Sequence, residues 1–160
     1  HTAYSAAKFA VKGFTEALLN DLRLNAPHVR CALVMPGHVA SQIAQNSQRA
    51  MPRTLERLAV ARKHLARQGV AITGLDDEEV LAVLRRNADH FRDSAPTSAE
   101  QAAAIILDGV RAGRWRILVG EDAAFMDRRV REDPENAYEP AFALALAQAR
   151  DQREQARSGA

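Results

Sequence analysis

Apolar side chains recur every three or four residues through several stretches of the chain, the spacing that places them on one face of an α-helix. The longest of these stretches runs from Tyr4 to Leu24 and contains no proline. Helices are also predicted over residues 42–68, 76–91, 97–112 and 122–131, and from 140 onward with fraying after 150. Thr97 and Glu100 are predicted to form a capping box at the start of the fourth helix, with Thr97 as the cap.

Two short apolar runs predict β-strands. The first, Val29 to Met35, is ended by Pro-Gly and has apolar side chains on both faces apart from Arg30. Such a strand is typical of a parallel sheet that helices cover on both sides. The second run, Trp115 to Gly120, follows a helix and a glycine. Helices alternating with apolar strands indicate an α/β protein.

Tyr4 and Lys8 are the main candidates for chemistry in the first helix. Side chains four residues apart share a helix face, with Cβ atoms about 6 Å apart. A nearby ammonium favours the phenolate and lowers the pKa of a tyrosine, which brings the phenol nearer to acid–base work at neutral pH. The alternative is an ordinary aromatic residue beside a solvated lysine. For a bare Tyr-x-x-x-Lys motif this alternative holds more often, so the surrounding sequence must decide.

The order and spacing of the motifs resemble the short-chain dehydrogenase/reductase family. Tyr-x-x-x-Lys on a long helix is followed by a strand and then by Pro36-Gly37-His38-Val39-Ala40-Ser41. The small residues around the motif, including Gly13, are also typical of that family. The resemblance is carried by residues 1 to about 41, with a family-like ending near Trp115 to Asp122.

The resemblance implies a role for each matching residue. Tyr4 would be the catalytic acid/base, and Lys8 would lower its pKa and hydrogen-bond the nicotinamide ribose, so that both also bind cofactor. Pro36, Gly37, Val39 and Ser41 would form the loop that lies against the nicotinamide, Ser41 standing where the family usually has threonine. His38 falls at a variable position and is read as part of the loop, without a catalytic role. No metal site is expected.

The family's glycine-rich phosphate loop and catalytic serine precede the tyrosine, whereas only His1-Thr2-Ala3 precede Tyr4. No Gly-x-Gly-x-x-Gly or Gly-x-x-x-Gly-x-Gly motif occurs in the 160 residues. The resemblance therefore implies the C-terminal part of a Rossmann-type doubly wound parallel sheet, with the partners of strand 29–35 outside this chain. We expect residues 1–132 to belong to that domain, 42–95 to form a helical substrate lid, and 133–160 to be a helical or frayed tail.

Composition and charge narrow the classes of function that remain possible. The net charge is +2, which argues against a dedicated nucleic-acid binder. The arginines of residues 42–68 could form an anion-binding patch, but no aromatic residues interleave for base stacking, so a solvated helix face is favoured.

Cys31 is the only cysteine and is read as a buried small side chain. No run approaches the ~20 apolar residues of a membrane span, and no signal peptide is recognisable, so a cytoplasmic protein is expected.

These observations predict an oxidoreductase that uses NAD or NADP and acts on a carbonyl/alcohol substrate, the 160-residue chain being inactive by itself. The helix that carries Tyr4 usually forms a dimer contact in the family, and Phe9, Gly13 and Ala17 would allow close approach. A homodimer or homotetramer is therefore expected, with no nucleic-acid or membrane partner. Two alternatives stay open: a non-catalytic remnant of the family and a helical interaction module.

Overall fold

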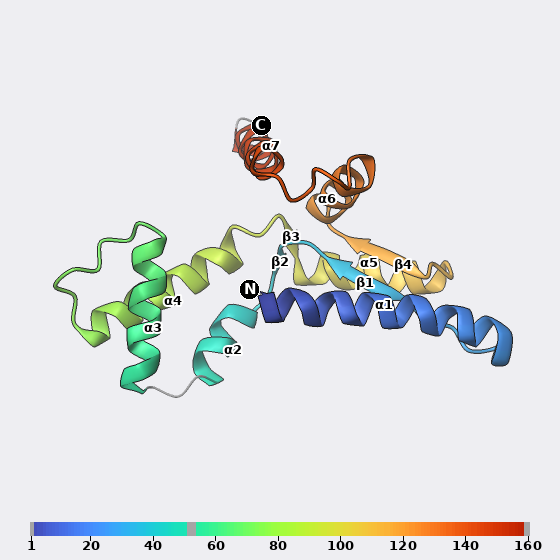
Figure 1. Ribbon diagram of the computed structural model, residues 1–160, viewed down its shortest axis with the longest axis horizontal. Helices are drawn as coiled ribbons and strands as arrows, with labels where there is room; N and C mark the ends of the chain where they lie inside the picture. Colours follow the sequence, from blue (N-terminus) through green and yellow to red (C-terminus); the bar gives the residue numbers. More distant parts are fainter. Residues whose placement is uncertain (1, 51–53, 159–160) are drawn as a thin grey trace. The chain divides into compact units, whose positions relative to one another are not determined.

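The computed structural model describes residues 2–50 and 54–158 (Figure 1). They divide into two compact units, one formed by residues 1–37 and 102–160 and the other by residues 38–101. The division falls directly after Gly37, inside the Pro-Gly segment, and again within the first turn of a helix that begins at Ala99.

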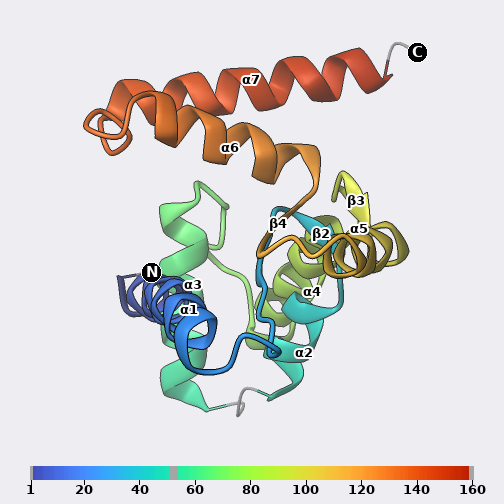
Figure 2. The same cartoon turned by 90° about the vertical axis from the view of Figure 1, so that its right-hand side faces the viewer.

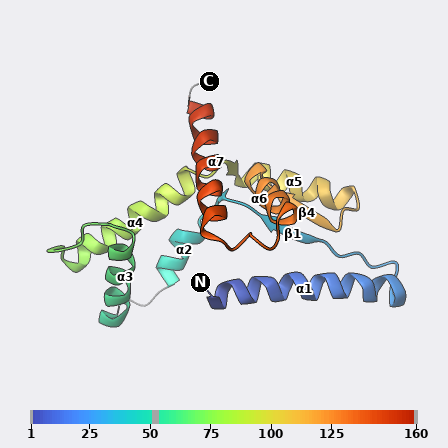
Figure 3. The same cartoon turned by 45° about the horizontal axis from the view of Figure 1, so that its top comes forward.

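The first unit begins with helix α1, Thr2–Asn25, as the apolar periodicity predicts. Pro27 follows directly, and proline cannot continue a helix. The chain then turns back and runs beside α1 towards strand β1, Leu33–Pro36 (Figure 3). None of the side chains of α1 is fully buried. The helix is therefore held in this unit by a modest contact with β1, and much of its apolar surface faces solvent.

Strand β1 pairs in parallel with β4, Arg116–Val119, in the register Leu33↔Arg116 to Pro36↔Val119. This pairing differs from two sequence-based predictions. Ladder pairing covers only the last part of the predicted run 29–35, and one partner of the strand does lie in this chain. The reason is the link between the two strands, which is long enough for the crossover that parallel pairing requires. Leu33, Ile117 and Val119 are buried and form the core of the unit.

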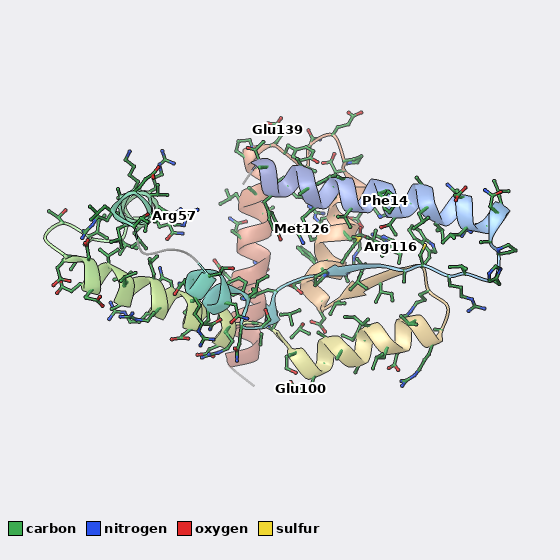
Figure 4. The ribbon with its side chains drawn as sticks, turned by 90° about the horizontal axis from the view of Figure 1, so that it is seen from below. Phe14, Arg57, Glu100, Arg116, Met126 and Glu139 are labelled. Carbon is green, nitrogen blue, oxygen red and sulfur yellow. The ribbon has the colours of Figure 1, made fainter. Side chains whose placement is uncertain are left out.

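Helices lie on both sides of this strand pair. Figures 2 and 4 show α1 on one side and α5, Ala99–Arg111, on the other. Gly109 of α5 lies against Ile117 of β4 so closely that an added Cβ would be 2.6 Å from the Ile117 Cδ1 atom. This arrangement is a mixed α/β fold with parallel strands. The doubly wound Rossmann sheet is consistent with it and stays a prediction.

Two helices complete the first unit. Gly120 has a φ of 97°, which favours glycine, and leads from β4 into α6, Glu121–Glu132. Helix α7, Pro140–Ser158, continues past residue 150, where the sequence predicts fraying. The sequence predicts a helix over residues 122–131 and another from residue 140 onward, and both helices are present.

The second unit is mainly helical. It contains α2 (Ile43–Ala50), α3 (Leu55–Arg67), α4 (Asp77–Asp93) and the short parallel strands β2 (Val39–Ala40) and β3 (Thr97–Ser98). Leu65, Val80 and Ala88 are buried where the helices meet. The side chain of Gln48 on α2 donates to the Leu84 carbonyl of α4 at 2.7 Å, which ties those two helices together.

Helix starts in this unit follow side-chain capping. Asp76 accepts from the Glu79 amide and Glu79 accepts from the Asp76 amide, both at 2.8 Å, which is a complete capping box. The box predicted for Thr97 and Glu100 is wrong by one residue. Ser98 accepts from the Gln101 amide at 3.1 Å, and the Gln101 side chain accepts from the Ser98 amide at 2.9 Å. Thr97 is instead buried and paired with Val39, which removes it from the cap position.

Candidate functional site

Tyr4 and Lys8 lie one turn apart on α1, as the sequence predicts. The Lys8 Nζ atom is 5.3 Å from the centroid of the Tyr4 ring, within the range of a cation–π contact. The Tyr4 side chain is 63% exposed, and Lys8 is also exposed. The helix therefore presents a phenol and an ammonium group next to each other on a surface that a ligand can reach.

Pro36 and Gly37 end strand β1. The Gly37 amide donates to the Val119 carbonyl at 2.9 Å, which extends the pairing with β4 by one bond. A Cβ atom at position 37 would lie 2.2 Å from Oδ1 of Asp122, the second residue of α6. A side chain at position 37 would therefore have to displace the Asp122 carboxylate, which packs directly on the Gly37 backbone. The contact of Asp122 with Gly37 was not predicted from the sequence, although an acidic residue in the first helical turn after Gly120 is a detectable signal.

Helix α6 is fixed on β4 by an ion pair, which explains why Asp122 is held in place. Arg116 of β4, labelled in Figure 4, donates from Nη2 to Oδ1 of Asp127 on α6. Arg131 donates to the same carboxylate at 3.2 Å. Burial raises the pKa of Asp127, but hydrogen bonds and charges from Arg116 and Arg131 outweigh it, so the pKa lies below its usual value. The side chains of Arg116 and Asp127 are 18% and 17% exposed, so solvent screens the pair only weakly.

Val39 and Ser41 lie near the start of the second unit, which begins at His38. Val39 pairs with Thr97 in the β2–β3 ladder, and half-buried Ser41 lies two residues before α2. His38, which was read as part of the loop, makes specific contacts. Its Nε2 atom is 2.6 Å from the Phe91 carbonyl, and its ring centroid is 4.2 Å from that of Phe91. These contacts attach the start of the unit to the end of α4.

The six residues predicted to form the site thus fall on both units. The first unit carries Tyr4, Lys8, Pro36 and Gly37, and the structure brings Tyr4 and Lys8 together on α1. The second unit carries Val39 and Ser41. Their catalytic and cofactor-binding roles stay predictions. The chemistry of Tyr4 and Lys8 fits the nicotinamide end of a dinucleotide, because a hydroxyl and an ammonium side by side can bond ribose hydroxyls.

Other kinds of site are absent from the described part of the chain in two respects. In residues 2–50 and 54–158, no three or more histidine, cysteine, aspartate or glutamate side chains are grouped so that they could hold a metal ion. Within the same ranges, no helix combines the length and the apolar character needed to cross a membrane.

Comparison with known proteins agrees with the motifs. Residues 1–52 match the family model described as short chain dehydrogenase. The chain is 30% identical over 128 residues to "Putative oxidoreductase SadH" of Mycobacterium tuberculosis, in the strains CDC 1551 / Oshkosh and ATCC 25618 / H37Rv. The match covers 79% of this chain and 36% of each relative. No solved structure gives a significant match. The family resemblance predicted from the sequence is therefore confirmed.

Proposed function

Over residues 1–52 the chain belongs to the short-chain dehydrogenase family, and we propose on this basis that the chain carries the proton-transfer groups of a nicotinamide-dependent oxidoreductase. The substrate would be a carbonyl/alcohol pair, and the cofactor NAD or NADP. The observation that carries the proposal is the pairing on α1, where the Lys8 ammonium lies 5.3 Å from the ring of an exposed Tyr4. Comparison with the SadH proteins supports the oxidoreductase class.

In the proposed reaction, the Tyr4 hydroxyl donates its proton to the carbonyl oxygen of the substrate as that carbon is reduced. Nicotinamide, when bound, supplies the hydride. The substrate gains one hydride and one proton to become the alcohol, and Tyr4 is left as a phenolate. Lys8 stabilises that negative charge through its adjacent ammonium and binds the ribose. Solvent then returns a proton to Tyr4. In the oxidation direction the same groups move the proton the opposite way.

Substrate and cofactor would also contact the segment that links the two units. Pro36, Gly37, Val39 and Ser41 are proposed to line the nicotinamide, with Asp122 supporting the backbone of Gly37. The helical segment 42–95 is proposed to close over substrate, since closure of such segments excludes water and completes the active site.

The test is a matched pair of tyrosine substitutions in the longest protein that carries this sequence. Tyr4→Phe removes the acid/base hydroxyl and is expected to lower kcat about 10²–10⁴-fold, the usual contribution of a positioned general acid or base. Tyr138→Phe is the control, because Tyr138 is 82% exposed and belongs to no predicted site. Turnover of aldehydes and ketones would be followed with NADH and NADPH. Equal turnover in the two variants would remove Tyr4 from the mechanism and favour the interaction-module alternative.

Homo-oligomerisation through α1 is a second part of the proposal. Phe9 and Phe14 are 64% and 69% exposed, and no atom lies within 4 Å of a Cβ built on Gly13. Phe9, Gly13 and Ala17 follow one another at a four-residue spacing, so a second helix could approach closely along that face. Phe9→Asp is expected to reduce the oligomer mass in sedimentation experiments. Leu24→Asp, near the helix end where Leu24 is 82% exposed, should leave the oligomer mass unchanged. Equal loss in both variants would contradict this contact.

A further inference from the structure

The helical unit of residues 38–101 contains a cavity that no assignment above explains. It has a volume of about 570 Å³ and is formed by side chains from α2, α3 and α4. Cavities that bind small organic molecules have volumes of roughly 300–1,000 Å³. Leu58, Leu81 and Leu84 give it an apolar wall, and Arg49, Arg57 and Arg85 stand around it. Figure 4 shows Arg57 on α3.

The charge in this cavity is unbalanced. Arg49, Arg57 and Arg85 have no carboxylate within ion-pair distance in the described ranges 2–50 and 54–158. The one acidic residue that lines the cavity, Asp89, is engaged elsewhere: it lies 3.5 Å from Arg92 and accepts from Gln45 at 3.2 Å. By contrast, Arg62 of the same arginine-rich segment is bound to Asp77 and to the Leu75 carbonyl, both at 2.8 Å. The three arginines at the cavity thus carry positive charge that no carboxylate of the described ranges pairs with.

The helices that carry these arginines are joined by direct hydrogen bonds. Gln48 donates to the Leu84 carbonyl, and Gln45 donates to the Ala88 carbonyl at 3.2 Å, so that α2 is fixed on α4. Leu65 of α3 is almost completely buried, at 1% exposure, which fixes the third helix in the same unit. The helices that line the cavity are therefore fixed on one another, while the exposed arginine side chains at its edge can reach a ligand from solvent.

We propose that this cavity binds an amphipathic organic acid, with a carboxylate between the arginine guanidinium groups and a hydrocarbon tail against the three leucines. A guanidinium group matches a carboxylate through two parallel hydrogen bonds, and it stays charged at all physiological pH values. The leucine wall removes the tail from water, so head and tail are each recognised. This inference stands on the geometry of residues 38–101 alone and does not require the oxidoreductase proposal to be correct.

The experiment is calorimetric titration of the protein with decanoate, decanol, acetate and inorganic phosphate. Decanoate is expected to bind saturably, and each of the other three much more weakly, because decanol lacks the charge while acetate and phosphate lack the tail. Arg57→Gln and Arg85→Gln are each expected to weaken decanoate binding about tenfold, the effect of losing one charge-assisted hydrogen bond. Raising the salt concentration should weaken it further.

Arg86→Gln is the matched control. Arg86 is the neighbour of Arg85 on α4, is exposed and does not line the cavity, so its loss should leave decanoate affinity unchanged. Tyr4→Phe should also leave it unchanged, which separates this inference from the proposed catalysis. Absence of saturable decanoate binding, equal binding of decanol or phosphate, or equal weakening by Arg86→Gln would each overturn the assignment.

Discussion

Two glycine-to-alanine substitutions, at Gly109 and Gly13, test the packing of helix on strand in the first unit. Both glycines lie inside helices, α5 and α1. Alanine is favoured over glycine in a helix by about 0.8–1 kcal/mol, so helix propensity alone predicts that both variants are stabilised. Their surroundings differ. A Cβ on Gly13 meets nothing within 4 Å, whereas a Cβ on Gly109 would lie 2.6 Å and 2.8 Å from two carbons of Ile117.

Ile117 is 2% exposed, so its side chain has little room to move away from a new methyl group. Overpacking of this kind costs about 1–3 kcal/mol. After the gain in helix propensity is subtracted, Gly109→Ala is expected to lower the free energy of unfolding by about 0–2 kcal/mol. Gly13→Ala is expected to raise it by up to about 1 kcal/mol at protein concentrations too low for the proposed contact between two α1 helices.

The measurement is urea-induced unfolding followed by circular dichroism, at equal protein concentration for the wild type and both variants. The difference between the two variants isolates the overpacking cost, because the chemical change is the same in each. Equal stabilisation by both substitutions would refute the close contact between α5 and β4.

Two further predictions concern the contacts that hold Asp122 and α6. Because the pKa of Asp127 is lowered in the folded protein, its ionised form stabilises the fold above the usual aspartate pKa of about 3.9, and this stabilisation is lost as pH falls through the lowered folded value. Asp127→Asn should therefore destabilise the protein by about 1–3 kcal/mol at pH 7 and by less near pH 3 in urea unfolding; an equal loss at both would contradict the ion pair with Arg116. Gly37→Ala should destabilise the protein because its Cβ meets the Asp122 carboxylate, and Asp122→Ala in the same chain should recover part of that loss in a double-mutant cycle. Strictly additive effects of Gly37→Ala and Asp122→Ala would count against the contact.

Local sequence signals predicted the helices well, because their evidence lies within a few residues. The apolar periodicity from Tyr4 to Leu24 and the proline at position 27 define α1 to within two residues at its start and one at its end. The wrong assignment of Thr97 as the helix cap also comes from reliance on local sequence signals. Thr97 and Ser98 are both good caps, and the choice between them is made by the pairing of Thr97 with Val39, which a local pattern does not contain.

Contacts between distant segments were harder to predict. Strand β1 pairs with β4, and Gly37 contacts Asp122, across more than 80 positions of sequence. The arginine-rich segment shows the same limit. The predicted solvated face agrees with the exposure of Arg49 and Arg57. The sequence pattern does not show that Arg62 is bound to Asp77, or that Arg49 and Arg57 meet Arg85 of α4 at a cavity.

The measurement that tests the central claim most directly is a double-mutant cycle on Tyr4 and Lys8. Turnover would be compared for Tyr4→Phe, Lys8→Met and the double variant, in the longest protein that carries this sequence. If Tyr4 and Lys8 act as one unit, kcat of the double variant should be little lower than that of Tyr4→Phe alone, because an ammonium with no phenolate to stabilise has lost that role. Saturating cofactor is used throughout, so that loss of the ribose contact of Lys8 does not limit turnover. Lys12→Met is the control, since Lys12 lies one turn further along α1 and faces Glu16 at 3.9 Å. The account predicts a large loss from Lys8→Met and none from Lys12→Met; equal effects of the two lysines, or full additivity with Tyr4→Phe, would contradict it.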